Sequence, residues 1–203
     1  MKLFDGGKAP NPRRVRVFLA EKGIEVPLVS VDMGAMGHRS EEITARNPLR
    51  RLPVLELDDG TVLTESVAIC RYFEELHPEP PLFGVGALGK AKVEEWQRRL
   101  ELNLLGTVAA AFRHLHPAMK EWEVPQIAEW GEANKPKALD FLTFLDKELA
   151  TRAFVAGDAY SIADITGMIA IDFMKPARIQ VPEELVNVRR WHAAVSARSS
   201  AQA

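Results

Sequence analysis

Residues 51–66 read RLPVLELDDGTVLTES, and this stretch decides the fold. The order of residue types predicts a strand, a tight turn, a second strand and then a helix. Proline cannot donate to a strand ladder, so we expect Pro53 at the start of an edge or bend, where a cis peptide bond would turn the chain sharply. The backbone of Leu52 is then free to pair with an extended partner, and Ser66 offers a hydroxyl and a helix dipole to a carboxylate. The stretch therefore predicts a site for a small acidic peptide.

Length and composition limit the classes of protein to which the chain can belong. It has 203 residues, 47% of them hydrophobic, which is enough for one large domain or two small ones. The formal net charge of -2 gives no reason to expect nucleic acid or an anionic membrane as partner. No apolar run approaches the roughly 18 residues that span a bilayer, and no signal-peptide stretch precedes the first strand. Cys70 is the only cysteine, so internal disulfides are excluded and a reducing cytoplasm is expected.

The first part of the chain alternates strand and helix patterns. Residues 2–5 read as a strand, and Asn11 followed by Pro12 is the N-cap arrangement that starts a helix. A second strand is expected over residues 26–31 and a short helix from residue 40. With the strand, turn, strand and helix that follow, the order is βαβαββα. This order predicts an α/β thioredoxin-like domain over residues 1–80.

The rest of the chain is helical in pattern. The proline-rich residues 77–81 are predicted to form a linker between domains. Apolar residues then recur at helical spacing, which predicts an all-α helical-bundle domain over residues 87–203. Pro136 predicts either a helix start or a kink. Ser161 and Asp164 form a capping-box pattern, whose role is predicted to be structural and worth about 1 kcal/mol.

Several motifs together resemble the glutathione-binding domain of cytosolic glutathione transferases. They are Leu-Pro-Val-Leu at 52–55, Asp-Asp-Gly-Thr at 58–61 and Glu-Ser-x-Ala-Ile at 65–69. The resemblance also includes Gly-His-Arg at 37–39, Asn-Pro at 47–48 and AGDAYSIADI at 156–165, so it covers nearly the whole chain. It implies a homodimeric detoxification enzyme that uses glutathione as co-substrate and no metal. The implied reaction is attack of the glutathione thiolate on a hydrophobic electrophile.

The resemblance also implies which residues hold glutathione. Leu52, beside a cis Pro53, would pair its backbone with the cysteinyl unit, Glu65 would meet the γ-glutamyl ammonium, and Ser66 would take the α-carboxylate. The glycyl carboxylate would meet His38, Arg50 and Arg51. Ordinary helix-start composition would explain the Glu-Ser pair taken alone, but not beside Leu52 and Pro53. For the arginine pair a plainer interpretation, as solvated charges, stays open.

The group that activates the thiol is not fixed by the sequence. A free thiol with a pKa of about 8.5 is only a few per cent ionised at neutral pH, so an enzyme must stabilise the thiolate. The family places Ser, Cys or Tyr near the end of the first strand, but this chain has Ala9 where relatives carry the serine, and Phe4 lacks a tyrosine's hydroxyl. Asn11 resembles the asparagine of a bacterial and fungal subgroup that reads Thr-Pro-Asn, although it could simply cap the helix.

Two other sources of thiolate stabilisation stay open. One is the set of backbone N–H groups at the start of the first helix. The other is a water held by helix side chains, as in a fungal-type subgroup without the usual hydroxyl. For that water the candidates are Arg113, His114 and His116, while Ala109 stands where the subgroup carries a serine.

The electrophile site is predicted in the helical domain. Its candidate residues are Phe112, His114, His116 and Met119, with Phe173 as a further apolar side chain. Periodicity alone does not separate such a pocket from core packing. Cys70 lies on an apolar helix face and is predicted to be a buried core thiol rather than a nucleophile.

Two other functions remain as alternatives to conjugation. One is a glutathione-dependent reductase of disulfides or peroxides, which the Asn11 resemblance favours. The other is a glutathione-binding regulatory protein with weak or no turnover, which Ala9 keeps open.

Overall fold

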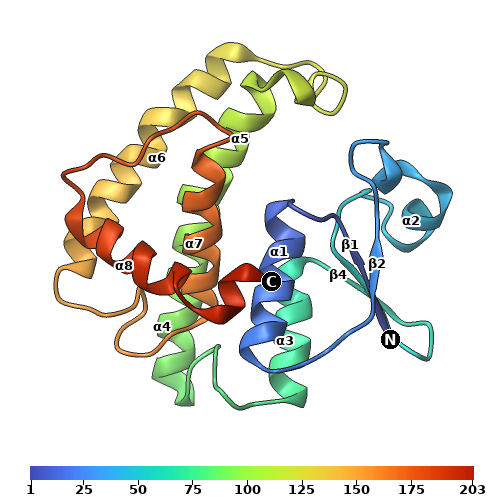
Figure 1. The fold of residues 1–203 in the computed structure, drawn as a ribbon, viewed down its shortest axis with the longest axis horizontal. Helices are drawn as coiled ribbons and strands as arrows, with labels where there is room; N and C mark the ends of the chain where they lie inside the picture. Colours follow the sequence, from blue (N-terminus) through green and yellow to red (C-terminus); the bar gives the residue numbers. More distant parts are fainter. The chain divides into compact units, whose positions relative to one another are not determined.

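The computed structural model describes all 203 residues and divides into two compact units. Unit 1 comprises Met1–Leu82 together with Ser199–Ala203, and unit 2 comprises Phe83–Arg198 (Figure 1). The chain's last helical turn, Ser199–Gln202, packs on helix α1 (Pro10–Glu21), where the Arg13 side chain donates to the carbonyl of Ala201 over 3.0 Å. The end of the chain is therefore part of unit 1.

Unit 1 is built on a four-stranded mixed sheet with the order β2-β1-β3-β4. Strand β1 pairs in parallel with β2, whereas the β1–β3 and β3–β4 pairs are antiparallel. The predicted order βαβαββα and the thioredoxin-like arrangement are confirmed. The elements are β1 (Lys2–Asp5), α1 (Pro10–Glu21), β2 (Leu28–Ser30), α2 (Glu41–Arg46), β3 (Val54–Glu56), β4 (Val62–Thr64) and α3 (Ser66–Leu76).

The second strand is shorter than the 26–31 expected from the sequence. Only Leu28–Ser30 has regular strand geometry. Two hydrogen bonds nevertheless continue the pairing at its ends, from Leu3 N to Pro27 O and from Val31 N to Asp5 O. The predicted segment thus lies beside β1 over nearly its full length, although its ends depart from strand geometry.

The two faces of the sheet are covered by different helices. Leu3 and Leu55 are paired neighbours with no exposed surface, as the period of two along a strand requires for one buried face. On the opposite face Phe4 and Val54 form a cluster with Ile43 of α2. Helices α1 and α3 pack side by side (Figure 1). The central strands are therefore buried on both sides.

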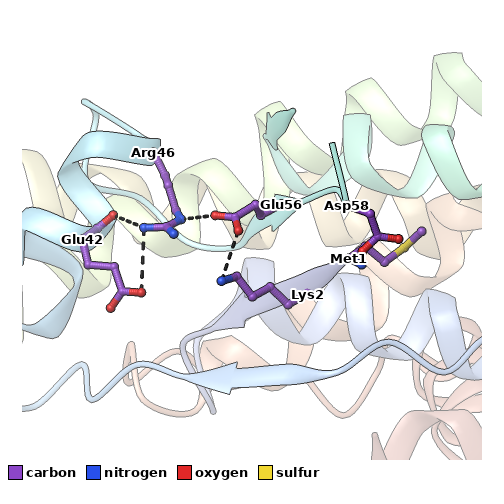
Figure 2. Close-up of polar contacts among 6 residues, drawn as sticks. All are labelled: Met1, Lys2, Glu42, Arg46, Glu56 and Asp58. Atoms are coloured by element: carbon purple, nitrogen blue, oxygen red, sulfur yellow. Dashed lines mark hydrogen bonds and ion pairs between the residues drawn. The ribbon is translucent and has the colours of Figure 1, made fainter. Parts of the chain in front are cut away.

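Ion pairs tie α2 to the sheet (Figure 2). The Arg46 guanidinium contacts the Glu56 carboxylate of β3, and Lys2 of β1 lies 3.1 Å from the same carboxylate. Arg46 also donates to the Glu42 carbonyl over 2.9 Å and lies over the Phe4 ring, 4.7 Å from its centroid. Hydrogen bonding from Arg46 first, and then from Lys2, holds the pKa of Glu56 below its usual range. The network fixes the helix that precedes the loop at residues 47–53.

Unit 2 is built of helices, as predicted, with one isolated β-bridge between Phe154 and Gly157. An uninterrupted helical run comprises α4 (Gly86–Arg99), a π-helical turn (Leu100–Leu105) and α5 (Gly106–Leu115). Pro136 lies inside α6 without starting a new helix. The remaining elements are a 3-10 turn (Pro117–Met119), α6 (Ala128–Leu149), α7 (Ile162–Met174) and α8 (Val186–Ser196).

Helix α7 forms the centre of unit 2. It is buried all round, which marks a core helix rather than a surface one. Gly167 allows this burial, because a Cβ at that position would lie 2.7 Å from the ring of Trp191. No helix of the chain combines the length and apolar character that a membrane crossing requires.

Candidate functional site

The loop at residues 47–53 is held in shape by one buried amide. Asn47 is 3% exposed; its Nδ2 donates to Arg51 O over 2.9 Å and its Oδ1 accepts from Leu49 N over 3.1 Å. Arg50 adopts a positive φ of 55° within this turn. The sequence analysis named Asn47 only as part of the Asn-Pro motif, so its bracing role was missed. Asn side chains often accept from the backbone N–H two residues on, as Asn47 does from Leu49 N, so an Asn at the start of a turn is a signal that could have indicated it.

The braced loop leaves one backbone position open. The Leu52–Pro53 peptide bond is cis, and Leu52 has its side chain buried in the cluster of Phe4, Ile43 and Val54. Neither the N–H nor the C=O of Leu52 forms a backbone hydrogen bond within the chain. An extended peptide could therefore pair with Leu52, because both backbone groups lack a partner.

The start of α3 lies at the same end of the β3–β4 hairpin as Leu52. Val54 pairs with Thr64, so Leu52 and Ser66 each lie two positions beyond that pair. Ser66 is the first residue of α3, and Glu65 precedes it with φ 66° and ψ 115°. No side chain caps this helix, and its first backbone hydrogen bond runs from Ile69 N to Glu65 O. The N–H groups of the first turn are therefore available to an anion.

A buried arginine lies beneath Ser66. The Nη1 of Arg14 donates to Ser66 Oγ over 2.8 Å, and the two residues are 1% and 5% exposed. The sequence analysis did not single out Arg14. Its position four residues before Phe18 places it on the buried face of α1, so the helical period of 3.6 contained a signal for it. The contact with Ser66 joins residues 52 positions apart and could not be read from local sequence.

The loop between β1 and α1 is fixed by Asp5. Its carboxylate contacts the Arg16 guanidinium and accepts from Gly7 N over 2.8 Å. Helix α1 begins at Pro10 with Ala9 as its N-cap, so the prediction that Asn11 caps the helix is wrong. Asn11 is instead an exposed residue of the first turn, and its side chain forms no hydrogen bond within the chain.

The first turn of α1 has few backbone N–H donors because it contains two prolines. Pro10 and Pro12 have no N–H, and Arg13 N donates to Ala9 O over 3.2 Å. Asn11 N is the donor that remains in this turn. Asn11 therefore carries both the free main-chain donor and the free side-chain amide at the start of α1.

The three residues predicted to meet the glycyl carboxylate differ in their surroundings. His38 is 5% exposed, and burial first, then the charges of Arg39 and Arg51, lower its pKa, so its imidazole is neutral at neutral pH. Arg50 and Arg51 are exposed and form no ion pair within the chain. The structure thus offers two cations and one neutral imidazole here, rather than three positive charges.

In unit 2 the candidate histidines already have partners. His114 Nδ1 accepts from Ile127 N over 3.0 Å, and its Nε2 lies 3.8 Å from a Glu123 oxygen. His116 Nδ1 accepts from Ala118 N over 3.2 Å and so caps the 3-10 turn. Both rings therefore help to shape the segment between α5 and α6.

Phe112 lies at the centre of a half-buried aromatic cluster in unit 2. Its ring is 4.7 Å from the His116 ring and 4.9 Å from the Phe173 ring, centroid to centroid. Met119, in the adjacent 3-10 turn, is also half-buried. This arrangement brings together Phe112, His116 and Phe173.

Other groups of reactive side chains do not form a second site. Cys70 is fully buried, as predicted, and burial raises the pKa of its thiol. Asp172 and Ser196 both approach the same nitrogen of His192, Nε2, at 2.9 and 3.4 Å, so they are not arranged as a Ser-His-Asp relay. No three acidic, histidine or cysteine side chains come together as a metal-binding group.

Comparisons with known proteins identify the family. The family described as "Glutathione S-transferase, N-terminal domain" matches residues 9–76, and "Glutathione S-transferase, C-terminal domain" matches residues 128–199. The chain belongs to the glutathione S-transferase family. The predictions of this family, and with it of glutathione transferase function, are confirmed.

Individual relatives agree with this assignment over the full length of the transferase. The chain is 37% identical to "Glutathione S-transferase 2" of Saccharomyces cerevisiae, in an alignment that covers 98% of this chain and 87% of that protein. The crystal structure of Gtt2 from the same organism matches with a TM-score of 0.95 over 100% of this chain and 99% of that one. A class Gtt2 structure from Vibrio parahaemolyticus matches with a TM-score of 0.88 at 38% identity, over 100% and 96% of the two chains.

The two matched stretches differ in what they contain. The N-terminal match includes Asn11 and the segment from Leu52 to Ser66. Neither match includes residues 112–119, which carry the candidate electrophile residues.

Proposed function

We propose that the transferase conjugates the thiolate of glutathione to hydrophobic electrophiles and serves in detoxification. The observation that carries the proposal is the open backbone of Leu52 at the same end of a hairpin as the uncapped start of α3. An extended peptide with a terminal carboxylate needs both features, a strand-like edge and an anion site, within a few residues' length.

Each part of glutathione has a chemical counterpart in unit 1. Leu52 pairs with the cysteinyl backbone beside Pro53, and the first-turn N–H groups and hydroxyl of Ser66 take the γ-glutamyl α-carboxylate. The exposed carboxylate of Glu65 meets the ammonium group. The glycyl carboxylate is met by Arg50 and Arg51, with the neutral His38 as a hydrogen-bond partner rather than a charge.

Thiolate stabilisation falls to Asn11. Ala9 has no donor in its side chain, and the prolines on either side of Asn11 have no N–H. The Asn11 amide and its main-chain N–H are therefore the donors that the start of α1 offers to a thiolate. A water held by His114 or His116 is less well supported, because each ring already has a hydrogen-bond partner.

The electrophile is bound by unit 2 in this proposal. The aromatic cluster of Phe112, His116 and Phe173, with Met119 nearby, offers polarizable and apolar surface to a hydrophobic molecule. His114 shapes the segment that carries Met119 through its bond to Ile127 N. The shape of the segment between α5 and α6 would then determine which electrophiles fit.

The remaining parts of the proposal concern partners and location. We propose a homodimer in the cytoplasm, with glutathione as co-substrate, no metal, and no nucleic acid or membrane partner. The near-neutral charge and the single buried cysteine support this setting. Leu88 and Leu102, which are 73% and 58% exposed on one continuous helical run, are apolar side chains that a second subunit could cover.

An ultraviolet titration of glutathione bound to the protein tests the role of Asn11. Asn11→Ala should raise the pKa of the bound thiol by about one to two units, because one hydrogen bond to the thiolate is lost while the main-chain donor stays. Asn187→Ala, which removes an amide that donates to Asp146 in unit 2, is the matched control and should leave the thiol pKa unchanged. An unchanged titration in Asn11→Ala would remove Asn11 from the mechanism.

The same preparation separates the rival functions. Glutathione binding without any fall in the thiol pKa would favour the regulatory protein that Ala9 keeps open. Turnover of a glutathionyl disulfide but not of a halogenated aromatic would favour the reductase. The reductase would have to work without a protein thiol, because Cys70 is fully buried.

A further inference from the structure

Arg14 is a fully charged side chain in the interior of unit 1. It is 1% exposed, although arginine stays protonated in proteins and its burial is opposed by several kcal/mol of lost hydration unless it is paired. An arginine in such a place needs polar partners. Arg14 lies between α1 and α3, where its partner Ser66 belongs to the proposed peptide site.

The face of α3 that packs on α1 carries polar groups at intervals of four residues. Ser66, Cys70 and Glu74 lie on this face, and all three are buried. Arg14 donates to Ser66 Oγ over 2.8 Å, and its charge also acts on the Cys70 thiol. The Glu74 carboxylate, two turns beyond Ser66, is 2.5 Å from Lys22 Nζ. The Glu74 end of this row is thus paired with Lys22, and the Ser66 end accepts a hydrogen bond from Arg14.

The donor and the acceptor in the Arg14–Ser66 hydrogen bond are fixed by their chemistry. A guanidinium has five donors and no acceptor, so Ser66 Oγ is the acceptor in this bond. The hydroxyl hydrogen of Ser66 is then directed away from Arg14. A hydrogen bond from a charged donor also polarises the hydroxyl and makes it a stronger donor to a third group.

We propose that Arg14 is a positioning residue that fixes Ser66 as a donor to the carboxylate of the bound peptide. The inference rests on the proposed function, since it concerns the γ-glutamyl α-carboxylate that Ser66 would receive. Arg14 acts on that carboxylate through the hydroxyl and does not touch the thiol. It should therefore set the affinity for the carboxylate and leave the ionisation of the bound thiol unchanged.

A purely structural role makes a different prediction. If Arg14 only joins α1 to α3, its replacement weakens the fold and the binding of every ligand of unit 1 alike. A pair of ligands that differ only in the α-carboxylate separates the two roles. Glutathione and 4-aminobutyryl-cysteinylglycine are such a pair, because the second lacks that carboxylate and is otherwise the same peptide.

Calorimetric titration of both peptides into the full chain gives the test. Arg14→Met should weaken glutathione binding by up to about tenfold, no more than the loss of the Ser66 hydroxyl itself, and change the affinity for the decarboxylated peptide less than about twofold. Arg14→Lys keeps the charge but not the fork geometry, so it should lie between wild type and Arg14→Met. If Arg14→Met does not fold, the ratio of the two affinities in Arg14→Lys decides the question.

A double variant checks that Arg14 acts through Ser66. Arg14→Met combined with Ser66→Ala should bind glutathione within about twofold of Ser66→Ala alone, because the hydroxyl through which Arg14 acts is already gone. Arg46→Met is the matched control: Arg46 is half-buried in unit 1, pairs with Glu56 and does not contact Ser66. It should leave the affinity ratio unchanged.

Three results would count against the inference. An equal loss for both peptides would show a structural role, an unchanged glutathione affinity would show no role, and additive effects in the double variant would show that Arg14 does not act through Ser66. Failure of the unsubstituted chain to bind glutathione at all would instead remove the proposed function, and this inference with it.

Discussion

The starts of two helices of this transferase each carry a serine and a nearby acidic residue, but the acidic side chains are used differently. At the start of α7 the Asp164 carboxylate is fully buried and accepts four hydrogen bonds. They come from Ser161 N, Ser161 Oγ, Val155 N and Trp191 Nε1, each over 2.9 Å. The capping box predicted from Ser161 and Asp164 is confirmed, and the buried carboxylate is held by groups of the protein itself.

The start of α3 leaves the corresponding groups unused. Glu65 is exposed and adopts a positive φ of 66°, and no side chain caps the helix. The hydroxyl of Ser66 accepts from Arg14 instead of closing on its own helix. The first-turn donors therefore stay open to an anion.

The difference shows that residue types alone do not decide between stability and binding. Both helices offer a dipole, a hydroxyl and a carboxylate. In α7 the carboxylate folds back on its own helix start in the core, whereas in α3 it stays at the surface. A helix start that is left unsatisfied and held in a strained conformation is the one to examine for function.

The largest expected effect concerns the pH dependence of the closed helix start. Burial raises the pKa of Asp164 to about 6, although its four hydrogen bonds oppose the rise. In the unfolded chain the pKa is about 3.9. Below about pH 4 both states are protonated and the full contribution of this group is present; as the pH rises through about 6 the folded state must ionise a buried group and the contribution is lost. The free energy of unfolding should fall over this range by about 3 kcal/mol relative to Asp164→Asn.

Urea denaturation of both proteins from pH 4 to pH 7 measures this difference. Asp164→Asn has no proton to lose at this position, so every other titrating group cancels between the two proteins. If the wild-type protein instead gained stability relative to the variant as the pH rose, the four donors would outweigh burial and Asp164 would be ionised throughout.

Much of the fold could be predicted because its signals are local. The strand–turn–strand–helix pattern of residues 51–66 and the capping box at Ser161 depend on neighbours within a few residues. Asn11 was misread as a helix cap for a local reason as well. Pro10 is the first helical residue, and the prolines at 10 and 12 each fit the start of a helix, so the pattern left its boundary ambiguous.

The groups that support the site were missed because their contacts are distant in sequence or made with the backbone. Arg14 meets Ser66 across 52 positions, and a charged residue in a helix is normally read as solvated. Asn47 binds the main chain of its own loop, which composition does not reveal. Sequence thus indicated the residues proposed to contact the ligand better than those that hold them in place.

The next largest effects are expected from a matched pair of serine substitutions, one at each helix start. Ser66→Ala should weaken glutathione binding about tenfold, because a donor to the carboxylate is lost, and leave the pKa of the bound thiol unchanged. Ser161→Ala should lower the free energy of unfolding by about 1 kcal/mol, as the loss of a cap does, and leave the dissociation constant unchanged. Calorimetry gives the dissociation constant of each variant for glutathione, and denaturation gives the free energy of unfolding of each. If the folded Ser161→Ala protein lost as much affinity as Ser66→Ala, the distinction between a closed and an open helix start would not hold.

The smallest expected effect concerns the backbone of Glu65. A residue with a Cβ is strained at φ 66°, whereas glycine is not, so Glu65→Gly should be more stable than Glu65→Ala by about 1 kcal/mol. Both variants lose the same carboxylate, so both should bind glutathione more weakly than wild type and by similar factors. Thermal denaturation of the two variants side by side measures the strain separately from the charge. Equal stability of the two variants would mean that residue 65 is not held in this conformation in solution, and that the open start of α3 is not maintained at the expense of a strained backbone.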